Sequence, residues 1–152
     1  MIMNYELTDE TIEHGGRTLY RIRALVDMPH HRVKAGDLGG FVENIENLQE
    51  NAWVFDNARV YGDADVCGNA WVFGCAEVFG DADVCGNAWV FGYAKVSGNA
   101  KVFGNAWVFG NADVSGYAKV DGDAWVFDKA VVFGDALVYD NAKVFGYTEV
   151  NQ

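Results

Sequence analysis

The sequence predicts an all-β fold, a β-solenoid in which short strands wind into stacked coils. Valine stands at every sixth position from Val54 to Val150, and Leu48 and Val42 extend this register backwards. Alanine precedes each valine by two residues from Ala52 onward, and only Thr148 breaks the rule. Tryptophan recurs every eighteen residues. A six-residue unit is too short for a helix-turn-helix repeat, so each unit is expected to form one strand and one corner.

Strand geometry assigns an inside and an outside to each unit. Alternate side chains of a strand point to opposite sides, so alanine and valine point inward together and the residues between them point outward. Most corner pairs that follow are Gly-Asn, Gly-Asp, Asp-Asn or Gly-Tyr. Glycine, asparagine and aspartate tolerate the positive φ of a tight corner. We therefore expect a prism filled by valine and alanine.

The outward aromatic residues give the number of strands in a coil. Because tryptophan returns every eighteen residues and the unit has six, three strands make one coil. Coils that stack at roughly 4.8 Å would give about six coils and a prism on the order of 28 Å tall. The aromatic face, as we define it, consists of Trp53, Trp71, Trp89, Trp107, Trp125, Phe55, Phe73, Phe91, Phe109, Phe127 and Phe145.

This pattern resembles a known family. A coil of three strands and eighteen residues with small and aliphatic residues inside is similar to the hexapeptide-repeat left-handed parallel β-helix, over residues 48–150. The resemblance implies the left-handed sense, which the spacing alone does not give. The segments YELTDETIEHGGRTLYRIRAL, VKAGDLGGFVENIENL and WVFDNARVYGDADV resemble a group of small phage and prophage hexapeptide-repeat proteins. That likeness implies a phage setting and action on host proteins.

Residues 1–47 break the repeat and are expected to cap a β-helix that spans residues 48–152. Stacked repeats need caps because their end strands are otherwise unpaired. Gly15-Gly16 separates two alternating stretches and predicts a β-hairpin. One face of its second stretch would carry Thr18, Tyr20, Ile22, Ala24 and Val26. The segment from Tyr147 to Gln152 is a poor cap, so we expect another subunit to cover that edge.

Composition excludes several functional classes. The net charge of −11, from 22 acidic and 11 basic residues, argues against direct nucleic-acid binding, which needs clustered lysine and arginine. The chain has no apolar run of about 18 residues and no cationic leader, so we expect a protein of the bacterial cytoplasm without membrane contact. Cys67, Cys75 and Cys85 match no zinc spacing and are expected to be free thiols.

Residues that would support catalysis are not found where the family resemblance places them. Hexapeptide-repeat acyltransferases use a histidine near a subunit boundary and a loop that shapes the acyl-CoA groove. Here His14, His30 and His31 precede the coils, and no insertion interrupts the repeat after Leu48. The coils also lack the zinc-binding histidines of the related carbonic anhydrases. We expect no enzyme, catalytic residue, metal or cofactor, and interpret His30-His31 beside Pro29 as a polar turn.

Two charged columns are a second candidate feature. The acidic patch consists of Asp63, Asp65, Asp81 and Asp83, in which the last two residues lie one coil after the first two. Lys101 and Lys119 follow in the column of Asp65 and Asp83. Stacked carboxylates repel one another, so the patch is a candidate site for Ca²⁺ or for a partner's basic residues, with a solvated corner as the alternative. On another face the charges alternate, which predicts a ladder of salt bridges at Arg59, Glu77, Lys95 and Asp113.

The aromatic face is the strongest functional signal. Monomers rarely expose apolar patches beyond roughly 300 to 600 Å². Hiding about 800 Å² at ~25 cal/mol/Å² would give ~20 kcal/mol, above the ~4 to 15 kcal/mol cost of association. We therefore expect a homodimer or homotrimer through this face, with a self-stacked ladder left in water as the alternative. Threonine ladders, which an ice-binding surface would be expected to carry, are absent.

These observations predict a non-enzymatic, homo-oligomeric binding or scaffold protein that is phage-encoded and acts on a host protein, in its most specific form as an inhibitor of a bacterial defence system. A self-assembling structural polymer is the first alternative. An acidic nucleic-acid mimic is the second, although lysines such as Lys95, Lys101 and Lys119 interrupt any continuous acidic stripe. A relative of the acyltransferases without the catalytic histidine ranks last.

Overall fold

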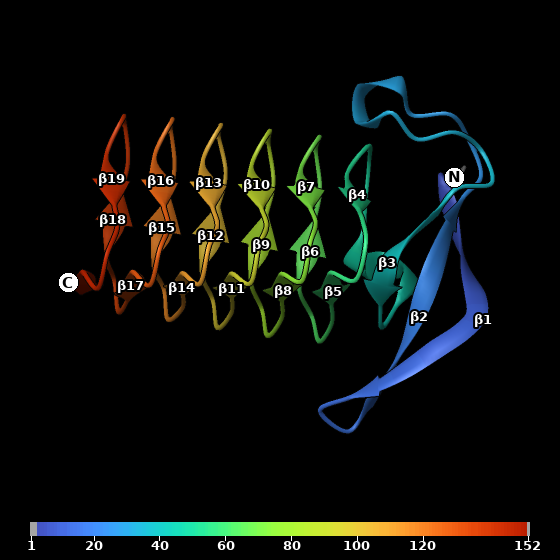
Figure 1. The fold of residues 1–152 in the computed structure, drawn as a ribbon, viewed down its shortest axis with the longest axis horizontal. Coiled ribbons are helices and arrows are strands. Elements are labelled where there is room, and N and C mark those ends of the chain that lie inside the picture. Colours follow the sequence, from blue (N-terminus) through green and yellow to red (C-terminus); the bar gives the residue numbers. More distant parts are fainter. Residues whose placement is uncertain (1–2, 152) are drawn as a thin grey trace.

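The computed structural model describes residues 3–151 and shows a β-solenoid whose N-terminal end is covered by a β-hairpin (Figure 1). Coils stack along the long axis, and the hairpin and its following loops lie at one end of the stack. Before the coils come β1 (Tyr5–His14), β2 (Arg17–Ala24), the 3-10 turn η1 (Pro29–His31), β3 (Leu38–Val42) and the 3-10 turn η2 (Ile45–Asn47). The predicted hairpin is confirmed, because β1 and β2 pair antiparallel.

The coils carry three strands each, as the eighteen-residue period predicts. The face that carries the tryptophans has β4 (Trp53–Val54), β7 (Trp71–Val72), β10 (Trp89–Val90), β13 (Trp107–Val108), β16 (Trp125–Val126) and, with lysine in place of tryptophan, β19 (Lys143–Val144). The next face has β5 (Arg59–Val60), β8 (Glu77–Val78), β11 (Lys95–Val96), β14 (Asp113–Val114), β17 (Val131–Phe133) and β20 (Glu149–Asn151). The third face has β6 (Asp65–Val66), β9 (Asp83–Val84), β12 (Lys101–Val102), β15 (Lys119–Val120) and β18 (Leu137–Val138).

Residues eighteen apart pair in parallel on every face, for example Trp89 with Trp107 and Val90 with Val108. This register keeps residues eighteen apart in columns, because the backbone N–H of each outward-facing residue donates to a carbonyl of the following coil, as Trp89 N does to Ala106 O. The predicted interior is confirmed. The valines and alanines at the inward positions from Ala52 to Val138 are all buried, with exposures of 0 to 4%.

The corners depend on glycine for two reasons. Gly68 has a φ of +64°, which L residues with a side chain seldom adopt, and a Cβ there would lie 2.9 Å from backbone atoms of Gly86 in the next coil. Four corners instead hold an acidic residue at positive φ. At one of them the Asp128 carboxylate accepts the N–H of Gly146 in the next coil at 3.0 Å. These short corner contacts explain why the repeat varies so little.

The cap continues the solenoid and is not a separate layer. β3 pairs in parallel with β5, which places Val42 opposite Val60, and Leu48 forms a bridge to Val66. The predicted extension of the valine register through Leu48 and Val42 is therefore confirmed. Cap residues and coil residues also share one hydrophobic cluster, which includes Tyr5.

The burial of the second hairpin strand changes along its length. Leu19 is the buried residue in its first half, whereas Ile22 and Ala24, two of the residues expected on one face, are buried in its second half. The alternation changes where the pairing of β2 with β3 is irregular, between Arg21 and Arg23. An irregular pairing of this kind shifts the side-chain parity of a strand.

Candidate functional site

Four tryptophans form a continuous outward column on β7, β10, β13 and β16. Ring centroids of neighbouring tryptophans from Trp71 to Trp125 lie 4.8 to 4.9 Å apart, and the ring planes are within 17° of parallel. Because each coil rises by one strand spacing, the rings stack face to face along the prism axis. Their faces cover one another and their edges point outward, so these side chains are half-buried.

A phenylalanine column runs beside the tryptophans. Centroids of neighbouring rings from Phe73 to Phe145 lie 4.6 to 5.5 Å apart and are stacked. Each tryptophan also meets the phenylalanine of its own coil edge to face, at 6.2 to 6.3 Å. Both stacked and edge-to-face geometries are favourable for aromatic rings. The two columns therefore form one rigid, apolar surface.

The first tryptophan does not belong to this surface, which corrects the prediction. Trp53 is only 1% exposed and contacts Tyr5 of β1 edge to face. A Cβ at Gly39 would lie 2.8 Å from Cζ2 of Trp53, so the absence of a side chain there gives the indole its space. The cap thus removes Trp53 from the predicted interface, and Phe55 packs beneath the cap beside His31.

His31, and not Trp53, stacks on the free face of Trp71 at the N-terminal end of the tryptophan column. Its ring stacks on Trp71 with centroids 5.0 Å apart, and it also stacks on Phe55. At the other end of the column the Lys143 ammonium lies 4.6 Å from the centre of the Trp125 ring. Four stacked indoles are thus flanked by an imidazole and an ammonium group. Cations over indole faces are a favourable arrangement.

The interpretation of His30-His31 as a simple polar turn is wrong for His31. His31 is 2% exposed, and burial lowers its pKa, while a hydrogen bond to Ala70 O at 3.4 Å acts in the opposite direction. Its Nδ1 is buried and has no hydrogen-bond partner among residues 3–151. His30 remains exposed at the surface of η1. The side chain of His31 therefore packs as an aromatic ring.

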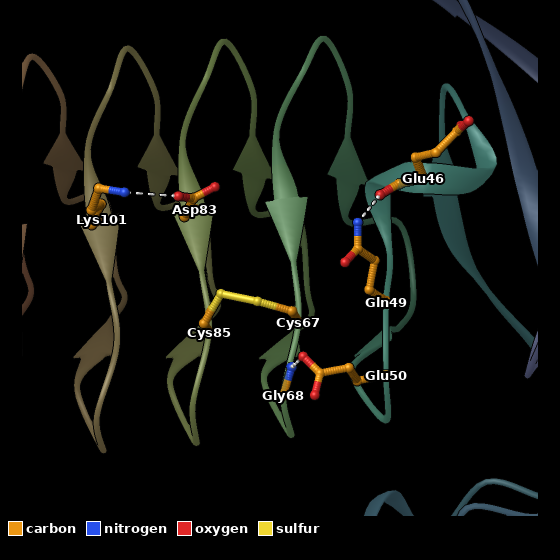
Figure 2. The surroundings of a disulfide bond; sticks show 8 residues. All are labelled: Glu46, Gln49, Glu50, Cys67, Gly68, Asp83, Cys85 and Lys101. Atoms are coloured by element: carbon orange, nitrogen blue, oxygen red, sulfur yellow. Dashed lines mark hydrogen bonds and ion pairs between the residues drawn. A yellow bond between two sulfur atoms is a disulfide. The ribbon is translucent and has the colours of Figure 1, made fainter.

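The acidic patch is placed as expected, with Asp65 opposite Asp83 in neighbouring coils. Asp83 forms an ion pair with Lys101, drawn in Figure 2, in which the ammonium nitrogen and the carboxylate oxygen are 3.1 Å apart. Burial raises the pKa of Asp65, and the charges of Asp83 and Asp63 raise it further. Among the described residues no group of three histidine, cysteine or acidic side chains could hold a metal ion.

The predicted salt-bridge ladder on the neighbouring face is wrong. The four residues share a column, yet within residues 3–151 no ion pair joins any two of them. Glu77 instead binds His14 of the hairpin at 2.8 Å and the Tyr61 hydroxyl at 3.0 Å. Burial alone would raise the pKa of Glu77, but these two hydrogen bonds, together with the charges of His14 and Lys95, outweigh burial and the pKa is lowered. His14 of the cap therefore binds the Glu77 carboxylate that the ladder prediction had paired within the column.

The expectation of three free thiols is also wrong. Cys67 and Cys85 form a disulfide between neighbouring coils, with their Cα atoms 4.6 Å apart (Figure 2), and Cys75 is free and exposed. A signal for this pair was present in the sequence. Cys67 and Cys85 are eighteen residues apart and so share a column, whereas Cys75 lies at another corner.

Exposed apolar side chains mark further parts of the surface. The largest exposures along the corner beside the phenylalanine column are Tyr93 at 66% and Tyr147 at 80%, and Phe145 on the face is 54% exposed. The aromatic face is therefore continuous with exposed tyrosines at its border. No helix in the described part of the chain is long and apolar enough to cross a membrane. Comparison of the sequence with protein-family models and with curated proteins gives no match to either.

Proposed function

We propose that this chain is a non-enzymatic, homo-oligomeric binding or scaffold protein whose aromatic face docks onto other protein surfaces. In its most specific form, the protein is phage-encoded and binds a host protein to inhibit a bacterial defence system. That specific form rests on the resemblance of its N-terminal segments to phage and prophage proteins. The docking role rests on the aromatic face.

The observation that carries the proposal is the stack of four indoles with its parallel row of phenylalanines. Aromatic residues are enriched at the centres of protein interfaces, where large rings bury much area. The columns are held by backbone hydrogen bonds between coils, so little side-chain freedom remains to be lost on binding. A surface of this kind is already organised for a partner.

The positions of the histidines support a role without catalysis. His31 is buried in the aromatic stack, and His14 is engaged with Glu77. Both side chains therefore have structural contacts that explain their presence. The structural-polymer alternative is less favoured, because β1, β2, β3 and η2 cover the N-terminal end of the coils. Head-to-tail growth through strand pairing needs two open ends.

The test is the double change Trp89→Ser and Trp107→Ser, both of which alter outward side chains and leave the valine and alanine interior intact. A matched control is Tyr117→Ser with Tyr139→Ser, two exposed aromatic residues outside the aromatic face. We expect the tryptophan variant to be folded, to sediment as a monomer and to lose any stoichiometric partner captured from bacterial lysate. The tyrosine variant should keep both properties.

Two readouts decide the outcome. Far-UV circular dichroism establishes that both variants are folded, and sedimentation gives their masses. A folded tryptophan variant that keeps the parent's oligomeric mass and its captured proteins would show that the aromatic face is not the docking surface. Capture of the same partner by the tyrosine variant and not by the tryptophan variant would support the proposal.

A further inference from the structure

We infer that the aromatic face binds a second copy of this chain, and that the two prisms run antiparallel about a two-fold axis as a dimer and not a trimer. This inference rests on the proposed docking role of the aromatic face. It adds the identity of the occupant, the orientation of the pair and the number of subunits.

The spacing of the rings favours a second copy as the occupant. The outward indoles repeat every 4.8 to 4.9 Å along the prism. Only a surface whose side chains repeat at the same spacing can interdigitate with these rings over the whole length of the face. A second copy carries that repeat by construction, because strand spacing sets it. A partner with irregular side-chain spacing would leave part of the face unfilled.

The cap decides the orientation. His31 of η1 is 2% exposed and stacks on the outward ring of Trp71, and His30 of η1 lies edge-on to the same ring. Residues of η1 therefore lie on the outward side of the first coil. The segment around η1 thus stands outside the plane of the aromatic face at its N-terminal end.

A parallel arrangement conflicts with this projection. In a parallel dimer, or in a trimer about an axis along the prisms, equivalent coils lie at the same height. Each cap would then lie between the two faces at the coil of Trp53 and hold the rings apart. In an antiparallel pair the caps lie at opposite ends of the assembly, and the coils from Trp71 to Lys143 can meet. A two-fold contact of this kind is also self-complementary and closed.

The antiparallel pair makes a positional prediction. The uncovered coils are those of Trp71, Trp89, Trp107, Trp125 and Lys143, so the two-fold axis passes near the coil of Trp107. The exposed corner beside the phenylalanine column carries Cys75 in the first of these coils, Asn111 in the middle one and Tyr147 in the last. A two-fold axis that crosses the prisms keeps this corner on the same side in both copies. Asn111 then faces its own equivalent, and Cys75 faces Tyr147 of the other copy.

Cross-linking with a bismaleimide of about 10 Å reach, the usual distance between packed sheets, tests this geometry. The native protein offers Cys75 as its free thiol, since Cys67 and Cys85 are paired. Two further single-thiol proteins carry Asn111→Cys or Tyr147→Cys, each together with Cys75→Ser. We expect Asn111→Cys to cross-link as a dimer alone. Neither the native thiol nor Tyr147→Cys should do so alone, but co-expression of these two proteins should give the cross-linked dimer.

Other results would overturn the inference. A native protein that sediments as two copies while Asn111→Cys gives no cross-linked dimer would indicate a parallel pair, because a two-fold axis along the prisms puts the two corners on opposite sides of the interface. A sedimentation mass of three copies would indicate a trimer. A monomeric native protein would also refute it, while loss of a captured partner in the Trp89→Ser, Trp107→Ser variant would still support the docking role. As a control, these two changes added to Asn111→Cys should abolish the cross-linked dimer.

Discussion

The coils and the cap are stabilised by different kinds of contact. In the coils, each side chain's environment follows from its place in the six-residue unit, because parallel hydrogen bonds keep residues eighteen apart in register. In the cap, environments depend on contacts between distant residues, as when Tyr5 donates a hydrogen bond to Ile45 O and His14 binds Glu77. Where backbone pairing is periodic, the environment of a side chain can be predicted from the sequence. Where it depends on a single non-repeating contact, it cannot.

The largest expected effect is on the coil interior. Val90→Asp should unfold the protein, because an unpaired charge among buried valines and alanines costs several kcal/mol. Lys119→Asp is the matched control, since Lys119 is exposed and lies beside Lys101, so stability should change by less than about 0.5 kcal/mol. Urea unfolding followed by circular dichroism measures both. Similar effects of the two changes would contradict the inside and outside assignment.

The disulfide between coils is the next largest expected effect. Cys67→Ser together with Cys85→Ser should lower the free energy of unfolding by about 3 kcal/mol, since the cross-link closes a loop of eighteen residues in the unfolded chain. Cys75→Ser should be neutral because that thiol is free and exposed. Guanidinium unfolding with and without reductant checks this. A native protein that is insensitive to reductant would argue against the disulfide.

A smaller effect is expected where the cap meets the first coil. Gly39→Ala should destabilise the protein by about 1 to 3 kcal/mol, because the added Cβ would lie 2.5 Å from Val54 O and 2.8 Å from the Trp53 ring. Gly16→Asn is the control. Its φ of +78° suits asparagine and nothing lies within 4 Å of the new Cβ. Thermal unfolding should separate the two variants, and equal midpoints would refute the tight contact.

The smallest expected effect is a pH dependence through His31. Burial lowers the folded-state pKa of His31 below 6.5, so the unfolded chain binds more protons as the pH falls through 6.5 and the free energy of unfolding decreases there. His31→Phe keeps an aromatic ring in the stack and should flatten this part of the profile. Glu77, whose pKa is lowered from 4.5, should contribute at a more acidic pH, where protonation removes its stabilising effect. Urea unfolding midpoints measured between pH 5 and 8 would test this role of His31. The same dependence of the midpoint on pH in the native protein and in His31→Phe would contradict it.

Much of the candidate site was predictable because columns follow directly from the period. The outward positions of Trp71 to Trp125, the phenylalanine row and the pairing of Asp65 with Asp83 all follow from a spacing of eighteen. The salt-bridge ladder failed although its column was correct. A shared column brings Arg59 and Glu77 near each other, but it does not reveal that His14 of the hairpin reaches Glu77 first.

By itself, the sequence determined the all-β class, three strands per coil, the buried valines and alanines and the outward aromatic columns, because identical units can stack only in register. Only the tertiary structure decided that Trp53 is buried beneath the cap and that His31 stacks on Trp71 at the end of the indole column. The burial of Trp53 and His31 depends on where the non-repeating residues 3–47 lie against the first coils. No period in the sequence encodes that placement, since it results from close packing around Gly39 and from contacts between residues tens of positions apart.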